Sequence, residues 1–140
     1  MSLCMLIAAD KPLPLCNRQT VRTRTVDVDG EIISISLACG FSVEEHIYYR
    51  DCVNDMGYSI KPYRYELDIC EDETDLQNLK DYLNENFAAG EVAELWGIWV
   101  SSHVESHPVC RETTCRELTV DDITTLCNAH IEDCWLSVIF

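Results

Sequence analysis

The chain has 140 residues, 47% of them hydrophobic, and a formal net charge of −15. This length suits one domain rather than two, and the apolar fraction excludes a disordered acidic tail. The excess of acidic residues argues against nucleic-acid binding, which needs a basic surface to release counterions. We therefore expect a single globular domain over residues 1–140 that folds alone or as a small homo-oligomer.

The sequence carries no predicted export or membrane segment. The apolar stretch 3–9 is too short to span a bilayer, and no basic residue precedes it as in a secretory signal. Nine cysteines are present, an odd number that fits free thiols better than a disulfide framework when no export signal accompanies them. These features predict a cytoplasmic protein with reduced cysteines and no membrane association.

After a short buried strand at residues 3–9, the clearest local prediction is a β-hairpin. Residues 21–28 and 31–39 alternate in the manner of strands, and Asp29-Gly30 between them is a typical two-residue hairpin turn. The residues that share one face of the second strand are Ile33, Ile35 and Leu37.

The middle of the chain predicts two helices with a strand between them. Residues 42–45 fit a helix-opening capping box, so we expect a short helix there. Tyr63, Tyr65 and the apolar residues that follow alternate with charged residues through residue 69, which indicates a half-buried strand. Residues 75–87 have leucines at helical spacing and acids in the first turn, which predicts the longest helix.

The last third predicts a strand, a loop, a helix and a final strand. Residues 93–100 form an apolar strand in which Gly97 indicates a bulge or a close backbone contact. Residues 101–115 are predicted to be loop, Thr119 caps a helix with Asp122 in the capping-box position, and residues 134–140 form the last strand. The order predicts an α+β fold with an antiparallel or mixed sheet of about five to six strands and two main helices packed on it.

Several short stretches recur together as a set: 9–14 (ADKPLP), 38–41 (ACGF), the helix at 76–83, 90–96 (GEVAELW) and 117–123 (ELTVDDI), followed by an apolar C-terminal strand. They resemble a family of small uncharacterised bacterial proteins. The resemblance covers most of the chain, although one Cys precedes Gly40 here where the family shows a denser Cys-Gly cluster. It implies a bacterial, cytoplasmic protein and carries over no activity and no functional residues.

An acidic segment provides the leading functional hypothesis. Residues 66–94 contain ten acids and one base, Lys80. Such a field accelerates encounter with a basic protein, as an immunity protein or nucleic-acid mimic would require, and it predicts salt-sensitive association. The alternative is an ordinary solvated surface. The residues predicted to bind the basic partner are Glu71, Asp72, Glu73, Asp75, Asp81 and Tyr82.

Two further hypotheses use histidine and cysteine. A structural zinc site would take its four ligands from one predicted loop, namely His103, His107, Cys110 and Cys115. The alternative for this loop is incidental thiols at the surface.

A cysteine-dependent enzyme would instead use Cys39, activated by His46, His103 or His130. The alternative for Cys39 is a buried strand residue, and we assign no catalytic residue from the sequence.

Overall fold

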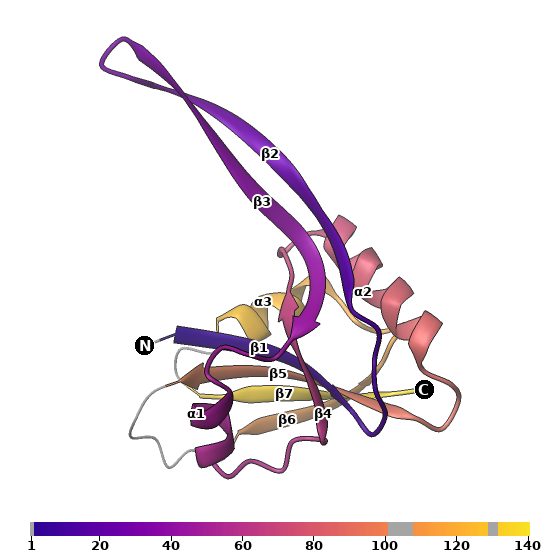
Figure 1. Ribbon diagram of the computed structural model, residues 1–140. Helices are drawn as coiled ribbons and strands as arrows, with labels where there is room; N and C mark the ends of the chain where they lie inside the picture. Colours follow the sequence, from indigo (N-terminus) through magenta and orange to yellow (C-terminus); the bar gives the residue numbers. More distant parts are fainter. Residues whose placement is uncertain (1, 101–107, 129–131) are drawn as a thin grey trace.

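One twisted sheet forms the framework of the protein (Figure 1). The computed structural model describes residues 2–100, 108–128 and 132–140, and the side chains of residues 22 and 37–39 lie outside this description. The strands are β1 (Ser2–Ala9), β2 (Cys16–Val28), β3 (Glu31–Glu45), β4 (Tyr63–Asp68), β5 (Val92–Val100), β6 (Val109–Thr114) and β7 (Cys134–Ile139). They lie in the order β2-β3-β4-β1-β5-β7-β6, antiparallel except for the parallel pair β6 and β7.

Helices cover both faces of the central strands. Helices α2 (Glu73–Asn86) and α3 (Val120–Cys127) lie over one face, and the short helix α1 (Arg50–Asp55) packs on the other. Strands β1 and β5 are therefore buried on both sides, which is why their sequences are nearly continuous apolar runs rather than alternating ones. The described helices are all too short or too polar to span a bilayer.

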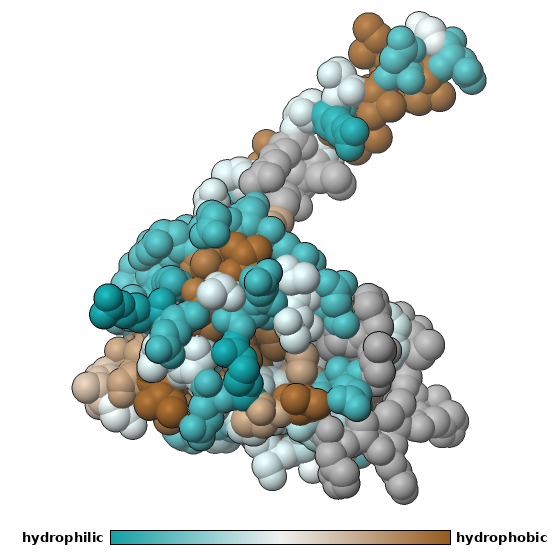
Figure 2. Space-filling view, turned by 180° about the vertical axis from the view of Figure 1, so that it is seen from behind, coloured by the Kyte–Doolittle hydropathy of each residue, from teal (hydrophilic) through white to brown (hydrophobic). Residues whose placement is uncertain are grey.

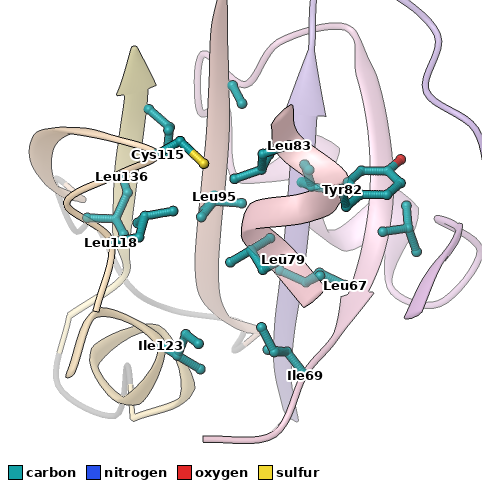
Figure 3. Close-up of a cluster of buried hydrophobic side chains, with 14 of the residues drawn as sticks. Leu67, Ile69, Leu79, Tyr82, Leu83, Leu95, Cys115, Leu118, Ile123 and Leu136 are labelled. Carbon is teal, nitrogen blue, oxygen red and sulfur yellow. The ribbon is translucent and has the colours of Figure 1, made fainter. Parts of the chain in front are cut away.

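The larger core lies between the sheet and helices α2 and α3. Leu79 and Leu83 of α2 point toward Leu95 of β5, and Ile123 lies below them on α3 (Figure 3). Tyr82 points to the other side of α2, where its ring meets Phe41 of β3. All six side chains are at most 2% exposed. The leucine spacing predicted from the sequence is therefore the buried face of α2.

Side-chain caps set where these two helices begin. The Asp72 carboxylate accepts a hydrogen bond from the Asp75 backbone N–H at 2.8 Å, which fixes the first turn of α2. At α3, Thr119 and Asp122 form a reciprocal capping box, as the sequence predicted. Both caps satisfy backbone donors that a helix leaves unpaired at its start.

The smaller core, on the α1 side, is organised by aromatic stacking. The Trp96 ring stacks on Trp135 with ring centroids 4.9 Å apart and on Tyr58 at 5.8 Å. The buried Asp133 carboxylate accepts hydrogen bonds from the Tyr58 hydroxyl at 2.5 Å and from the Trp99 backbone N–H at 2.6 Å. This carboxylate links the loop before β7 to β5 and to the segment after α1.

The structure confirms the α+β class and the mixed sheet, and it corrects several details. The described sheet has seven strands rather than five or six, because part of the predicted loop forms β6. Strand β6 is polar and mostly exposed, so it lacks the apolar alternation that marks a strand. Residues 42–45 belong to β3 rather than to a helix, because Ser42 pairs with Asp68 and Val43 enters the core; the helix begins at Arg50.

Gly97 confirms the predicted close backbone contact. The C-terminal part of α3 crosses β5 at this residue, and a Cβ placed on Gly97 would lie 2.4 Å from the carbonyl oxygen of Leu126. The contact joins backbone to backbone, so no side-chain rotation can relieve it. Only glycine allows α3 to approach the sheet this closely.

We predict that Gly97→Ala lowers the free energy of unfolding by about 3 kcal/mol, because α3 must move away from β5. Gly57→Ala is the matched control: its Cβ would meet no atom, so it should cost only the left-handed backbone strain of about 1 kcal/mol. Urea denaturation of both variants measures the difference. Equal losses would contradict the proposed clash with α3.

A projecting hairpin arm as the candidate interaction surface

The most unusual feature of the molecule is a two-stranded hairpin that leaves the sheet. Strands β2 and β3 pair continuously from Cys16–Val43 to Val28–Glu31, but β4 pairs only with residues 42–45 of β3. Residues 19–40, which we call the arm, therefore project from the body (Figure 1). At about 3.3 Å per residue the arm reaches about 33 Å from base to tip. A domain of this length has a radius of gyration of only about 14 Å.

The tip of the arm is the turn that the sequence predicted. Asp29 has φ 53° and Gly30 has φ 85°, so both central residues adopt the left-handed conformation of a type I′ turn. The Asp27 carboxylate accepts a hydrogen bond from the Gly30 backbone N–H at 3.1 Å. The turn matches the twist of the two strands and fixes their register.

The register divides the arm into two unlike faces. On one face Arg24 lies opposite Ile35, Val26 opposite Ile33 and Val28 opposite Glu31. We call this the apolar arm face, and its residues are Arg24, Val26, Val28, Glu31, Ile33 and Ile35. Apolar residues along the distal part of the arm are visible in Figure 2.

The opposite face of the arm is mainly hydroxyl-bearing. Thr23 and Ser36 lie opposite each other with their hydroxyl oxygens 3.2 Å apart, and Thr25 lies opposite Ser34. Ile32 and Val21 also lie on this face and are 77% and 71% exposed. Both faces of the arm therefore carry exposed β-branched side chains, with the denser apolar group on the first face.

The apolar arm face continues the core face of the sheet. Phe41 and Val43 stand on the same side of β3 and are fully buried, and the Phe41 ring meets Tyr82 of α2 at 5.6 Å. Beyond Phe41 the described helices no longer cover the strand. Ile33, Ile35 and Val28 are 44%, 46% and 48% exposed. The side chains on this face of β3 are thus buried at the base of the arm and exposed to solvent along its length.

The sequence contained the signal for this surface, but not its exposure. The alternation at Ile33 and Ile35 correctly predicted one apolar face. Alternation records which residues share a face and does not record whether another element covers it. The length of β2 and β3, 13 and 15 residues, is the clue that could have indicated an arm, since strands usually have five or six residues.

Three of the six predicted partner-binding residues have structural roles instead. Asp72 caps α2, and Asp75 is 3% exposed and accepts a hydrogen bond from the Cys70 backbone N–H at 2.7 Å. Tyr82 is 1% exposed, and its hydroxyl donates to the Pro14 carbonyl oxygen at 2.7 Å. Asp75 and Tyr82 are therefore not available to a partner at the surface.

The other three predicted residues remain accessible around α2. Glu71 and Glu73 are exposed, and Asp81 is half-buried and accepts a hydrogen bond from Gln77 at 2.8 Å. Glu71 accepts a hydrogen bond from the Thr124 hydroxyl of α3. A binding role for these three acids stays a prediction.

The predicted four-ligand zinc site does not fit the structure. His103 and His107 lie outside the described residues. Cys110 is exposed on β6, whereas Cys115 is buried in the core and directs its thiol toward the Lys80 carbonyl. The strand between Cys110 and Thr114 spans about 13 Å, and two thiolates that share a zinc ion must lie within about 4 Å of each other. The extended backbone therefore separates the two predicted cysteine ligands.

A cysteine–histidine pair exists, but it is not the predicted one. The side chain of Cys39 and all of His103 and His130 lie outside the described residues. His46 instead lies beside Cys4 of β1, with Nε2 and Sγ 3.8 Å apart in the buried interior. Burial raises the pKa of the Cys4 thiol to about 12, and the Glu66 carboxylate adds to the rise. The pair therefore lacks the thiolate that nucleophilic catalysis needs.

A surface hollow lies beside this pair, between the end of β3, α1 and β4. It has a volume of about 560 Å³, and its lining includes Glu45, His46, Arg50 and Arg64. The Arg64 guanidinium is committed to the fold, since it donates to the carbonyl oxygens of Lys61 and Ile60 and to the Asn54 side chain. The hollow is therefore lined on one side by an arginine whose hydrogen bonds stabilise the fold.

The cysteines are mostly, but not uniformly, free thiols. Among the cysteines whose side chains the structure describes, seven are free: Cys4, Cys16, Cys52, Cys110, Cys115, Cys127 and Cys134. Cys70 is disulfide-bonded, so the expectation of reduced cysteines throughout is wrong at this residue. The cytoplasmic location stays a prediction.

Comparison with known proteins adds no relative. No protein-family model, curated protein or solved structure matches the chain. The resemblance to small bacterial proteins stays a prediction.

We predict that Cys4 reacts with iodoacetamide at least 100-fold more slowly than the exposed Cys52 in the native protein. With a pKa of about 12, only about one Cys4 thiol in 10,000 is ionised at pH 8, and the side chain is buried. Timed alkylation followed by peptide mass spectrometry measures both rates. Fast labelling of Cys4 would contradict this prediction and would indicate that the Cys4–His46 pair holds a reactive thiolate.

His46 should make the protein less stable in mild acid. Burial lowers its pKa from the ordinary value of 6.5, and Arg64 and Arg50 lower it further, against an opposing hydrogen bond with the Tyr48 backbone. The unfolded chain therefore binds this proton more readily than the folded one. The stability that His46 contributes is present above the ordinary histidine pKa and is lost as the pH falls through the lower, folded-state pKa.

The test compares wild type with His46→Gln by urea denaturation from about pH 7.5 to about pH 5. We expect wild type to lose more unfolding free energy than the variant over this range, because the variant has no imidazole to protonate. Parallel curves would show that His46 titrates normally in the folded state.

Proposed function

We propose that this protein is a non-enzymatic protein–protein interaction module and that the arm is its binding element. The observation that carries the proposal is the arm itself, which projects about 33 Å from the body and exposes Ile33, Ile35 and Val28. An isolated two-stranded hairpin is only marginally stable in water. Burial of the apolar arm face against another protein would supply the packing that the arm lacks.

The chemistry of the arm favours a protein as its target. A β-ribbon offers unpaired backbone groups along its outer edges and rows of side chains on its faces, which are the features used in strand-mediated recognition. The exposed side chains described on the arm are branched aliphatic, hydroxyl-bearing and charged, without the aromatic stacking groups typical of single-stranded nucleic-acid binding. The chain's net charge of −15 also opposes approach to a phosphate backbone.

The body supports the same proposal in two ways. Glu71, Glu73 and Asp81 give the surface around α2 a negative field that would draw in a basic partner. The Cys4–His46 pair, with its raised thiol pKa, offers no activated nucleophile. An interaction role uses the exposed arm and the acids around α2, whereas the described Cys4–His46 pair is buried.

Site-specific photocrosslinking tests the proposal. A benzophenone amino acid replaces Val28 on the apolar arm face, and in a control protein it replaces the exposed Asn84 on α2. Both proteins are made in the cells that naturally contain the chain and are irradiated there. We expect the Val28 position to give one discrete covalent adduct that the Asn84 position does not give.

Two outcomes would overturn the proposal. No adduct from Val28, or the same mixture of adducts from Val28 and Asn84, would mean that the arm contacts other proteins no more specifically than the rest of the surface does. Circular dichroism of both purified proteins shows whether each variant retains the native fold.

A further inference from the structure

We infer that the apolar arm face binds the same face of a second copy of this chain, with the two arms antiparallel about a two-fold axis. The inference rests on the proposed interaction role of the arm and names its partner. It is argued from the order of charged and apolar residues along that face.

Three cross-strand pairs define the face from base to tip. Arg24 lies opposite Ile35, Val26 opposite Ile33, and Val28 opposite Glu31. The face is therefore basic toward the body, apolar in the centre and acidic at the tip. Because Val26 and Ile33 lie midway between the charged ends, the pattern is complementary to its own reversed copy.

Stacking two such faces antiparallel, centred on the Val26–Ile33 pair, brings opposite charges together. The axis runs across the strands, so β2 stacks on β2 and β3 on β3: Arg24 of each copy faces Val28 of the other and Ile35 faces Glu31. Arg24 of one copy and Glu31 of the other are then diagonal neighbours at the same end of the contact. A two-fold axis repeats every contact, as isologous dimers require. A parallel arrangement would instead gather both Arg24 side chains at one end of the contact and both Glu31 side chains at the other, which like-charge repulsion disfavours.

The Arg24–Glu31 contact cannot form within one chain along this face. The pairs that hold these two residues are four residues apart along each strand, a distance of about 13 Å. Arg24 and Glu31 therefore do not neutralise each other within one chain. Because of this separation, reversing either charge tests contact between chains rather than a contact within one chain.

The size of the face sets the expected affinity. Four aliphatic side chains per copy, partly exposed in the single chain, form a contact at the small end of the range for specific interfaces. We therefore expect reversible self-association with a dissociation constant in the micromolar range.

Sedimentation equilibrium of the purified full chain tests this geometry with charge reversals. We expect R24E and E31R each to weaken self-association at least tenfold, because each creates two like-charge contacts per dimer. An equimolar mixture of the two variants should associate about as tightly as wild type, since each chain then supplies the charge that the other lacks. The double variant R24E/E31R should also recover.

A matched pair of neutral substitutions tests the face. Ile33→Asn, on the apolar arm face, should weaken self-association at least tenfold. Ile32→Asn changes a more exposed residue on the opposite face of the same strand and should leave self-association unchanged. Circular dichroism confirms that each variant keeps its sheet.

The outcomes separate this inference from the proposed function. A wild-type chain that stays monomeric up to about 500 μM, more than two orders above a dissociation constant of about 1 μM, overturns the inference. Self-association that ignores the charge reversals, or responds equally to Ile32→Asn and Ile33→Asn, overturns it too. If the Val28 crosslink joins the chain to a different protein, the interaction role holds and the second copy is excluded. If Val28 gives no specific crosslink, the interaction role itself fails.

Discussion

The short ladder between β3 and β4 is the constraint on which the molecule depends. Only residues 42–45 of the fifteen-residue strand β3 pair with the central sheet, and Phe41 and Val43 anchor its base in the core beneath α2. This ladder holds in place a strand whose apolar side chains are buried in the core at one end and exposed to solvent at the other. The position, direction and exposed face of the arm all follow from it.

The arm and the body are stabilised by different interactions. The body buries both faces of β1 and β5, and it uses Asp133 and Glu94 as internal hydrogen-bond acceptors, the latter from the Lys61 backbone N–H. The arm has backbone pairing, a well-formed turn and exposed aliphatic side chains on both faces, but no described element packs over it. In water such a ribbon gains stability from an apolar surface that covers it, which is the physical basis of the proposed interaction role.

The fold separates the two cysteines of the predicted zinc site, whereas the predicted Cys39 nucleophile lies outside the described side chains and stays a prediction. The sequence suggested thiols that bind metal or attack a substrate, and both uses need an accessible thiolate. The fold instead places Cys115 in the core, Cys110 on an extended strand and Cys4 against His46 in the interior. Burial raises the thiol pKa values of Cys4 and Cys115, so these residues behave as small apolar side chains.

The sequence by itself determined the local elements whose signals are short-range. The Asp29-Gly30 turn, the Thr119 capping box, the leucine face of α2 and the tight contact at Gly97 all follow from residue spacing and backbone preference. Only the tertiary structure decided which apolar faces are covered. Ile35 and Val43 share the same alternation on β3, yet Ile35 is exposed and Val43 is buried. The reason is that α2 packs over Val43 and does not extend as far as Ile35. That boundary is a property of packing between distant segments, and no local pattern records it.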